Sequence, residues 1–466
     1  MDMRRLFILL CAIPTLVLAE PEPLALDQAV SHALEKNESL LSLQEQKEAG
    51  RQRRLQAYSS WLPAATLSGQ AKRMQEAAFQ GGNEQKTASL TISQAVLSSD
   101  LYYGCKGSQH ALDSLEYEVA ELSNELIFAV RKAYYNIILA QEDVKVQQEN
   151  IDVLSDALRR EEHELELGDS TIFDVNQSKV SVANALSGLY KAEKTLGVAR
   201  NALVRILGGK SQRNNDLQLS EDEIPILSIQ DLSGKLTQLG MLENDSENGA
   251  LIVEELFAKQ KQIPQRLGVS IYSEEEILHW ENIALAKRPK IKKMVAVDMS
   301  AGEYLNQKKG EYLPEVSASA SYDKVYPSST LASKLYENWA LGVQVSWNLF
   351  DGLGRERRIN EARALRSSTQ LDMTSTIEDA KVEVRDAIYD IEEALLSYYA
   401  AHGGVLLADE AIEQAKARRD LGVITPLEYR DVVASRTQAK QIFIQASYRL
   451  LTSYYSLRFA TGIDVS

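Results

Sequence analysis

The chain has few cysteines, few prolines in its long middle stretches, and no apolar run long enough to cross a membrane as a helix. Only Cys11 and Cys105 occur in 466 residues, and Cys11 lies in the first apolar segment. If that segment is removed, no intrachain disulfide can form, so burial and assembly must hold the protein together. Proline is absent between positions 63 and 225 and between positions 327 and 426, so both tracts permit long uninterrupted helices.

Basic residues are not in excess, and the patterns of catalytic and metal sites are missing. The formal net charge is -15 at pH 7, whereas a nucleic-acid-binding domain carries the opposite balance. The five histidines show no metal-ligand spacing. No phosphate-binding loop and no nucleophile with its base can be found. The sequence therefore predicts no enzyme, no cofactor, no metal site and no nucleic-acid partner.

The first residues are typical of an export signal. Arg4 and Arg5 precede an apolar run from Leu6 to Leu18, and small residues follow around Ala19. This order of charge, apolar run and small residues matches a signal peptide, and the run is too short to span a bilayer as a helix. We expect an exported chain without a helical anchor.

An internal duplication organises the rest of the sequence. Trp61-Leu62-Pro63 reappears as Tyr312-Leu313-Pro314, and Leu167-Gly168 reappears as Leu421-Gly422 at nearly the same spacing. Such self-similarity indicates a repeated structural unit, here one helix, a strand pair and two further helices. The expected boundaries are a signal peptide at 1–19, a first repeat at 20–209, an acidic insertion at 210–275 and a second repeat at 276–466.

Long helices are predicted by apolar residues that recur in alternating steps of three and four, the spacing of a coiled-coil seam. In the first repeat the seam residues are Leu112, Leu115, Val119, Leu122, Leu126, Ala129, Ala133, Ile137, Ala140, Val144, Ile151, Leu154 and Leu158. In the second they are Ile377, Ala380, Val384, Ala387, Ile391, Ala394 and Tyr398. A helix from about 100 to 167 would be about 100 Å long.

The segment 339–349 alternates strictly between apolar and polar residues. Its apolar side chains are Trp339, Leu341, Val343, Val345, Trp347 and Leu349. Such an alternation over about ten residues, with aromatic residues at the ends, is typical of a strand with one face in an outer membrane. Segments 316–323, 88–93 and, more weakly, 64–71 alternate in the same way. Four strands are too few to close a membrane barrel, so the chain must assemble with copies of itself.

At this point the sequence resembles the TolC family of outer-membrane efflux proteins. The resemblance rests on the duplication, on the segment from Val345 to Gly352 that leads into a long helix, and on the two turns at 167–171 and 421–425. It covers nearly the whole chain except about 210–275. It implies a mixed fold, with long α-helical hairpins forming a periplasmic α-barrel and four strands contributed to a trimeric transmembrane β-barrel.

The resemblance also implies a function and partners. The protein would be the outer-membrane exit duct of a tripartite efflux or type I secretion system, extending into the periplasm. It would form a homotrimer in outer-membrane lipid and meet a periplasmic adaptor protein and, through it, an inner-membrane pump. The alternative from another class is a periplasmic coiled-coil adaptor or scaffold that never enters the membrane.

Site residues follow from the resemblance by position. Gly168, Asp169, Thr171, Gly422 and Thr425 would form the helical tips that contact the adaptor. A second pair, Glu428 and Asp431, matches acidic residues that ring the tunnel entrance in some members; the alternative is an ordinary solvated helix face. Arg419 and Ile424 do not reproduce the tyrosine and arginine that hold the tip closed in other members, so the resemblance does not carry over the contacts that gate this channel.

Overall fold

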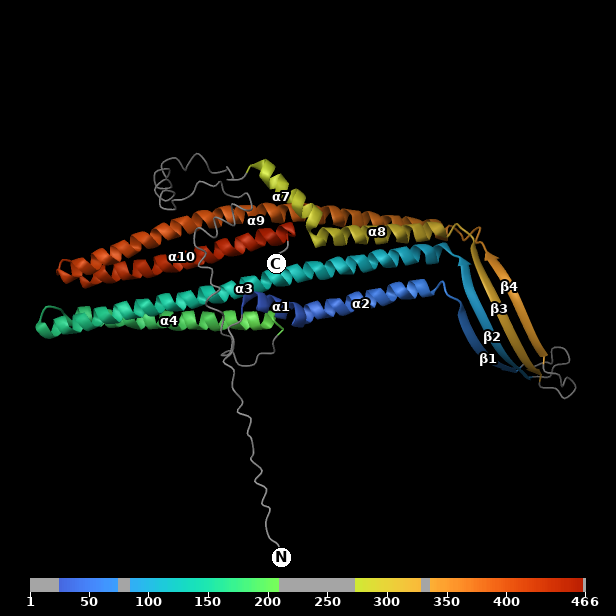
Figure 1. Cartoon of the computed structure of the whole chain (residues 1–466), viewed down its shortest axis with the longest axis horizontal. Coiled ribbons are helices and arrows are strands. Elements are labelled where there is room, and N and C mark those ends of the chain that lie inside the picture. The colour runs from blue at the N-terminus through green and yellow to red at the C-terminus, as the bar shows by residue number, and fades with distance from the viewer. Residues whose placement is uncertain (1–24, 74–83, 209–272, 328–335, 464–466) are drawn as a thin grey trace, which may run out of the picture. The chain divides into compact units, whose positions relative to one another are not determined.

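A computed structural model of the chain describes residues 25–73, 84–208, 273–327 and 336–463 (Figure 1). The first half of the element order is α1 Leu26–Lys36, α2 Glu38–Ser59, β1 Ala64–Arg73, β2 Glu84–Leu97, α3 Ser99–Leu167 and α4 Ile172–Ile206. The second half is α7 Glu274–Lys287, α8 Pro289–Gly310, β3 Glu315–Pro327, β4 Tyr336–Ser346, α9 Gly354–Asp420 and α10 Pro426–Thr461. The expected segments 1–19 and 210–275 lie outside, or almost wholly outside, the described residues.

Two short helices, not one, precede each strand pair, so that part of the prediction was wrong. Asn37 interrupts the first pair because its side chain accepts hydrogen bonds from the N–H groups of Ser39 and Leu40 and caps α2. In the second pair, Pro289 occupies the first turn of α8. The residue before a proline avoids the helical conformation, which ends α7 at that point.

The predicted long helices are present; six of the seven seam residues of α9 are buried, and of the thirteen in α3 five are buried and eight half-buried. α3 has 69 residues and α9 has 67. Buried seam residues include Leu112, Leu126, Ile137, Ala140 and Leu154 of α3, and Ala380, Val384, Ala387, Ile391, Ala394 and Tyr398 of α9. No helix in the described part of the chain is long and apolar enough to cross a membrane.

The chain divides into two compact units, and α1, α3, α9 and α10 contribute residues to both. In the first unit, the distal parts of the two helical hairpins share one core. Its buried members are Leu154, Ala157, Ala185, Ile412, Ala415, Tyr429 and Val433. The small alanines let neighbouring helices approach closely, as in a coiled coil.

The second unit contains one antiparallel sheet with the strand order β1-β2-β3-β4 (Figure 1). β1 and β2 come from the first repeat, and β3 and β4 from the second. The central pair joins the repeats, with Thr91 opposite Ser321 and Ile92 opposite Ala320. β4 ends at Ser346, so the expectation that Trp347 and Leu349 belong to the strand was wrong. The indole of Trp347 instead donates a hydrogen bond to the carbonyl oxygen of Tyr312 at 3.0 Å, where the chain has left the sheet.

Both long outgoing helices end in the same glycine motif. Gly168 has φ 85° and Gly422 has φ 69°, a left-handed conformation that costs a residue with a Cβ atom. Asp169 N–H donates to Glu164 O at 2.8 Å, and Val423 N–H donates to Arg418 O at 2.9 Å. These bonds satisfy carbonyl groups that the helix end leaves without partners.

Candidate functional site

One face of the sheet is apolar and open. On β4, the apolar side chains are Trp339, Leu341, Val343 and Val345, which are between 64% and 80% exposed. Directly opposite them on β3 stand Tyr322, Ala320, Ala318 and Val316. Folded proteins in water seldom present so continuous an apolar surface unless something covers it.

The opposite face of the same sheet carries hydroxyl side chains. Thr66 of β1 stands opposite Thr91 of β2, which stands opposite Ser321 of β3. A second row runs from Ser68 to Ser89. Because neighbouring side chains on a strand point to opposite faces, the sheet has one face suited to lipid and one suited to water.

The two outer strands each pair with one neighbour among the described strands. β1 pairs with β2, and β4 pairs with β3. An unpaired strand edge exposes a row of N–H and C=O groups and pairs readily with another strand. In an apolar environment these groups must find partners.

The tips of the two helical hairpins are capped by matching threonines. Thr171 accepts a hydrogen bond from the N–H of Asp174 at 3.2 Å, and its hydroxyl donates to the Asp174 carboxylate at 2.6 Å. Thr425 accepts from the N–H of Glu428 at 3.3 Å. The structure thus places Gly168, Asp169, Thr171, Gly422 and Thr425 at exposed turns, while their adaptor contact stays a prediction.

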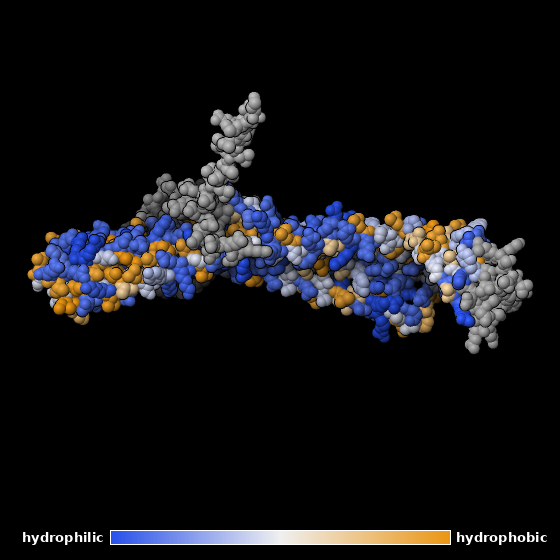
Figure 2. Space-filling view, turned by 90° about the horizontal axis from the view of Figure 1, so that it is seen from below, coloured by the Kyte–Doolittle hydropathy of each residue, from blue (hydrophilic) through white to orange (hydrophobic). Residues whose placement is uncertain are grey.

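Hydrophobic side chains are exposed around the same tips. Leu421 and Phe173 are 78% and 71% exposed, and Ile172 and Val423 are also exposed. Figure 2 shows hydrophobic surface near the ends of the hairpins. Exposed apolar groups on a rigid turn are suited to contact another protein.

Of the two acidic residues expected at the tunnel entrance, one already has a structural role. Glu428 accepts hydrogen bonds from the N–H of Thr425 at 2.9 Å and from its hydroxyl at 3.0 Å, which completes a capping box. The backbone N–H of Thr425, followed by its hydroxyl, lowers the pKa of Glu428. Asp431 is exposed, and its carboxylate has no ion pair among the described residues. Both remain candidates for the ring.

Behind the tips, a buried carboxylate joins the two hairpins. Glu161 of α3 is 1% exposed and accepts a hydrogen bond from Ser178 of α4. Arg430 of α10 donates to the Ser178 hydroxyl at 2.7 Å and lies 4.0 Å from the Glu161 carboxylate. Arg419 of α9 lies 3.5 Å from the other oxygen of Glu161. All four long helices therefore supply one side chain to the network.

Arg419 has two further contacts within this network. Its guanidinium donates to the carbonyl oxygen of Ala157 at 3.2 Å and lies 4.5 Å above the ring of Tyr429. A buried carboxylate needs such partners, since an unpaired buried charge is very costly. Sequence reasoning missed Glu161 because it lies in a run of acidic residues, and its partners are remote in sequence.

Beside the network lies a cleft of about 640 Å³ between α3, α4 and α10. Amide, hydroxyl and charged side chains dominate its lining: Gln147, Asn150, Gln177, Ser181, Asn184, Arg430, Asp431, Thr437, Gln438 and Gln441. Some of them already have partners: Thr437 donates to Asn150 at 3.1 Å, and Gln441 donates to Asp143, which lies outside the lining, at 2.8 Å. Leu154, Ala185, Leu427 and Ala434 complete the lining, so polar and apolar groups are mixed in it; a typical small-molecule site is lined mostly by apolar groups.

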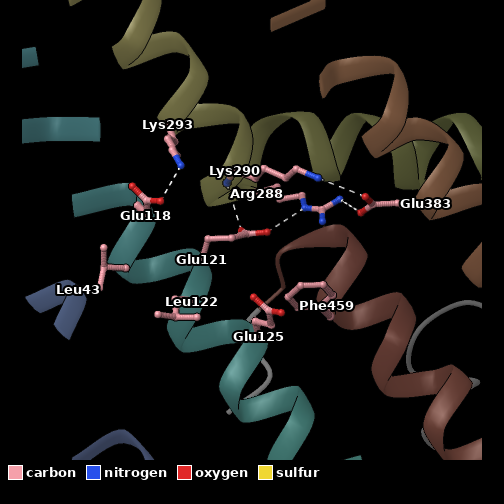
Figure 3. A pocket seen from close by; sticks show the side chains of 10 residues that line it. All are labelled: Leu43, Glu118, Glu121, Leu122, Glu125, Arg288, Lys290, Lys293, Glu383 and Phe459. Carbon is pink, nitrogen blue, oxygen red and sulfur yellow. Dashed lines mark hydrogen bonds and ion pairs between the residues drawn. The ribbon is translucent and has the colours of Figure 1, made fainter. Parts of the chain in front are cut away.

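A second cleft, of about 510 Å³, lies in the other unit at the start of α8 (Figure 3). Arg288 is 2% exposed and forms ion pairs with Glu121 at 3.5 Å and with Glu383. The first turn of α8 has no cap of its own, and Glu121 supplies one by accepting from the N–H of Lys290 at 3.2 Å. Lys293 pairs with Glu118 at 2.9 Å. The cations of this cleft are all paired, so it is a structural clamp.

The clamp also holds the end of α10. The guanidinium of Arg288 lies 5.5 Å from the ring centre of Phe459. Gly462 follows with φ 64°, and a Cβ atom there would come within 2.8 Å of the Cα atom of Arg288.

No group of metal-binding side chains occurs among the residues that the structure describes.

Comparisons of the sequence with a family model and with known proteins agree with one another. A family model described as "Outer membrane efflux protein" matches residues 29–209 and 280–463. The outer membrane protein TolC of Vibrio cholerae is 20% identical over 441 residues, which cover 94% of this chain and 90% of that protein. The alkaline protease secretion protein AprF of Pseudomonas aeruginosa is 21% identical over 477 residues, covering 99% and 90%.

Solved structures share the fold. The CmeC outer membrane channel of Campylobacter jejuni matches with a TM-score of 0.74 and 16% identity, over 94% of this chain and 85% of that one. The open state of the MtrE outer membrane channel of Neisseria gonorrhoeae matches with a TM-score of 0.69 and 16% identity, over 94% and 88%. At such identities the likeness concerns the fold, which is the mixed helical and strand architecture expected from the sequence.

Proposed function

The chain belongs to the outer membrane efflux protein family, and from this premise we propose how its parts serve an exit duct. It is an outer-membrane channel that extends into the periplasm and passes cargo from an efflux or secretion assembly to the exterior. The alternative of a periplasmic adaptor that never enters the membrane does not agree with this family. The main support for placing the sheet in the membrane is that it has one apolar face and one hydroxyl-lined face.

The sheet would form one third of a closed barrel in a homotrimer. Four strands leave two edges open, and lipid does not tolerate open edges because their polar groups would lack partners. Membrane barrels begin at about eight strands, so a single chain is insufficient. Pairing β4 of one copy with β1 of the next removes every edge when the ring closes, with Trp339, Leu341, Val343 and Val345 toward lipid.

The hairpin tips would be the contact with a periplasmic adaptor and, through it, with an inner-membrane pump. Gly168, Asp169 and Thr171 form one exposed turn, and Gly422 and Thr425 form the other. Both turns are fixed by glycine and threonine motifs, so a partner would meet a preformed surface. Preformed surfaces lower the ordering cost of binding.

Glu428 and Asp431 would place a ring of carboxylates at the tunnel entrance. They are three residues apart and therefore share a helix face, and both side chains are exposed. Rings of acidic side chains favour cations in narrow pores. Neutralising both is expected to weaken block by polyvalent cations, and unchanged block would contradict the ring.

We also predict that the chain has no catalytic activity of its own and needs no cofactor. The family is one of transport channels. The buried charges Glu161 and Arg288 are held in ion-pair networks that join helices, which is a structural role.

Single-channel conductance tests the duct directly. The purified protein in planar bilayers should give a small, cation-selective conductance that is closed for most of the time, because the proposed ring of carboxylates would favour cations at a narrow entrance. A protein that stays in solution without detergent and gives no conductance would contradict the proposal.

A further inference from the structure

The two repeats enter their long helices differently at the periplasmic end of the sheet. In the first repeat, β2 ends at Leu97 and α3 begins at Ser99, so a single residue separates strand from helix. In the second, β4 ends at Ser346 and α9 begins at Gly354. The segment 347–353 between them is irregular, and it continues the sequence of the apolar strand β4.

This segment holds large apolar side chains in an exposed position. Leu349 and Phe350 are 73% and 78% exposed, and Trp347 and Leu353 are also exposed. Leu353 has φ 69° and is the only non-glycine residue with a positive φ among those described. A leucine in this conformation is strained, and strain of this kind often marks a functional segment.

The exposure is not a result of looseness, because the segment is fixed on both sides. Arg355 is 4% exposed, donates a hydrogen bond to the carbonyl oxygen of Asn348 and lies 4.5 Å above the ring of Tyr312. Arg358 donates to Asp351 at 3.0 Å and to Glu311 at 2.6 Å. These contacts tie the segment to the end of α8 and keep its apolar side chains from folding inward.

Two exposed cations lie on the helices that hold this segment, Arg357 on α9 and Lys309 on α8. Arg357 follows Leu353 by one helical turn, since its N–H donates to the Leu353 carbonyl oxygen at 3.3 Å. Lys309 lies two residues before Glu311, the partner of Arg358. Both side chains are exposed, and neither has an ion pair among the described residues. In the first repeat, the corresponding start of α3 carries Asp100, whose carboxylate is bonded to Gln307 at 2.6 Å.

We propose that residues 347–353, together with Lys309 and Arg357, form a binding site for an anionic phospholipid of the membrane leaflet that faces the periplasm. The apolar side chains would insert among the acyl chains next to β4, and the two cations would bind the head-group phosphate. Aromatic side chains and cations are the usual anchors at the border of a membrane. Each protomer would carry one such anchor, since in the first repeat a single residue separates β2 from α3 and no comparable irregular segment exists there.

The site rests on the membrane location of β4 and not on the passage of cargo. Lys309→Gln with Arg357→Gln removes both free cations. The matched control is Lys292→Gln with Arg363→Gln, which makes the same charge change on the exposed surfaces of α8 and α9 away from the segment. A third variant, Leu349→Ser with Phe350→Ser, removes the apolar part and leaves the charges.

The full-length protein is titrated in detergent with phosphatidylglycerol or with phosphatidylcholine, and bound lipid is measured by native mass spectrometry. The double Lys309 and Arg357 variant should bind phosphatidylglycerol about 25-fold more weakly, at roughly fivefold per cation. The control variant should bind like the wild type, and the serine variant should bind both lipids more weakly. Conductance of each variant, measured in parallel, shows that it is folded and separates this site from the duct.

Equal phosphatidylglycerol affinity in the wild type and the Lys309 and Arg357 variant would overturn the proposal. So would a wild type that binds phosphatidylcholine as tightly as phosphatidylglycerol, because the cations would then play no part.

Discussion

The sheet and the hairpin tips differ in which groups they expose and bury: the sheet exposes apolar side chains, and the tips bury a charged one. The sheet leaves Leu341 80% exposed, and no described residue of the chain covers its apolar face, whereas the tips bury Glu161 to 1% exposure among Ser178, Arg419 and Arg430. In water both arrangements are costly, the first through apolar exposure and the second through loss of hydration. The difference shows where each part finds its missing stabilisation, lipid for the sheet and complementary charge for the tips.

Among the predicted changes, removing the charge of Glu161 should lower the stability of the protein the most. In Glu161→Gln the two arginines lose their buried counter-charge, which typically destabilises by about 3–5 kcal/mol. Glu162→Gln is the matched control, because Glu162 pairs with Lys179 at 3.0 Å on the surface and such pairs contribute about 0–1 kcal/mol. Thermal unfolding in detergent measures both. Equal melting temperatures for the two variants would contradict the network.

A charge on the apolar face of the sheet should have the next largest effect. Leu341→Arg places a guanidinium on the face assigned to lipid, at a cost of about 2–4 kcal/mol near the membrane centre. Ala340→Arg, one residue earlier, puts the same group on the hydroxyl-lined face and should be tolerated. The amount of assembled protein in outer-membrane fractions tests this. Loss of both variants to the same extent would argue against two distinct faces.

At the tips, the turn glycine can be compared with a helical one. Gly422→Ala forces a Cβ atom into φ 69° and should destabilise by about 1–2 kcal/mol. Gly404→Ala lies inside α9 with open space around it and should stabilise by about 0.5–1 kcal/mol, because glycine is a poor helix former. The melting temperatures should therefore shift in opposite directions. If both melting temperatures shifted in the same direction, the requirement for glycine at position 422 would be contradicted.

Loss of a helix cap should have a smaller effect and allows the two tips to be compared. Thr425→Ala and Thr171→Ala each remove the side-chain acceptor for one N–H group, and each should cost about 1 kcal/mol. Hydrogen exchange of the Glu428 and Asp174 amides reports on each tip separately. Exchange that is unchanged at the mutated tip would show that the cap is not formed.

The smallest predicted effect is on how the stability contributed by Glu428 depends on pH. The Thr425 hydrogen bonds lower the folded-state pKa of Glu428, so its contribution is fully present above the unfolded pKa of about 4.3. It is lost as the pH falls through the lower, folded pKa. The melting-temperature gap between the wild type and Glu428→Ala should narrow as the solution is acidified below pH 4. A constant gap would show that the carboxylate charge is not involved.

Much of the fold could be predicted from periodicity alone. The helix 99–167 was placed to within one residue, because proline is absent and Gly168 ends the run. The alternation along Trp339, Leu341, Val343 and Val345 correctly predicted that these four side chains share one face of the sheet, since a strand has a strict period of two. The period does not show where a strand leaves its sheet. The hydrogen bond from Trp347 to Tyr312 decides that, and it joins segments distant in sequence.

The buried charge network could not be predicted for a related reason. Glu161 and Arg419 are separated by a whole repeat and meet only when the two hairpins pack. Nothing in the acidic run from Glu161 to Glu166 marks the first carboxylate as buried. Glu428 shows the converse, because the Thr425-to-Glu428 spacing of a capping box is visible in the sequence, yet the alternatives drawn from the sequence were only a ring at the tunnel entrance and a solvated helix face.

The most direct test of the account compares two neighbouring residues of β4. Val343→Cys and Gln344→Cys, each in a Cys105→Ser background, are spin-labelled and reconstituted into lipid vesicles. The accessibility of each label to oxygen, which concentrates in lipid, and to a water-soluble nickel complex is then measured. The account predicts that the label at 343 is relaxed by oxygen and the label at 344 by nickel. If both labels were equally accessible to nickel, the sheet would not separate lipid from water, and the assignment of its two faces would be wrong.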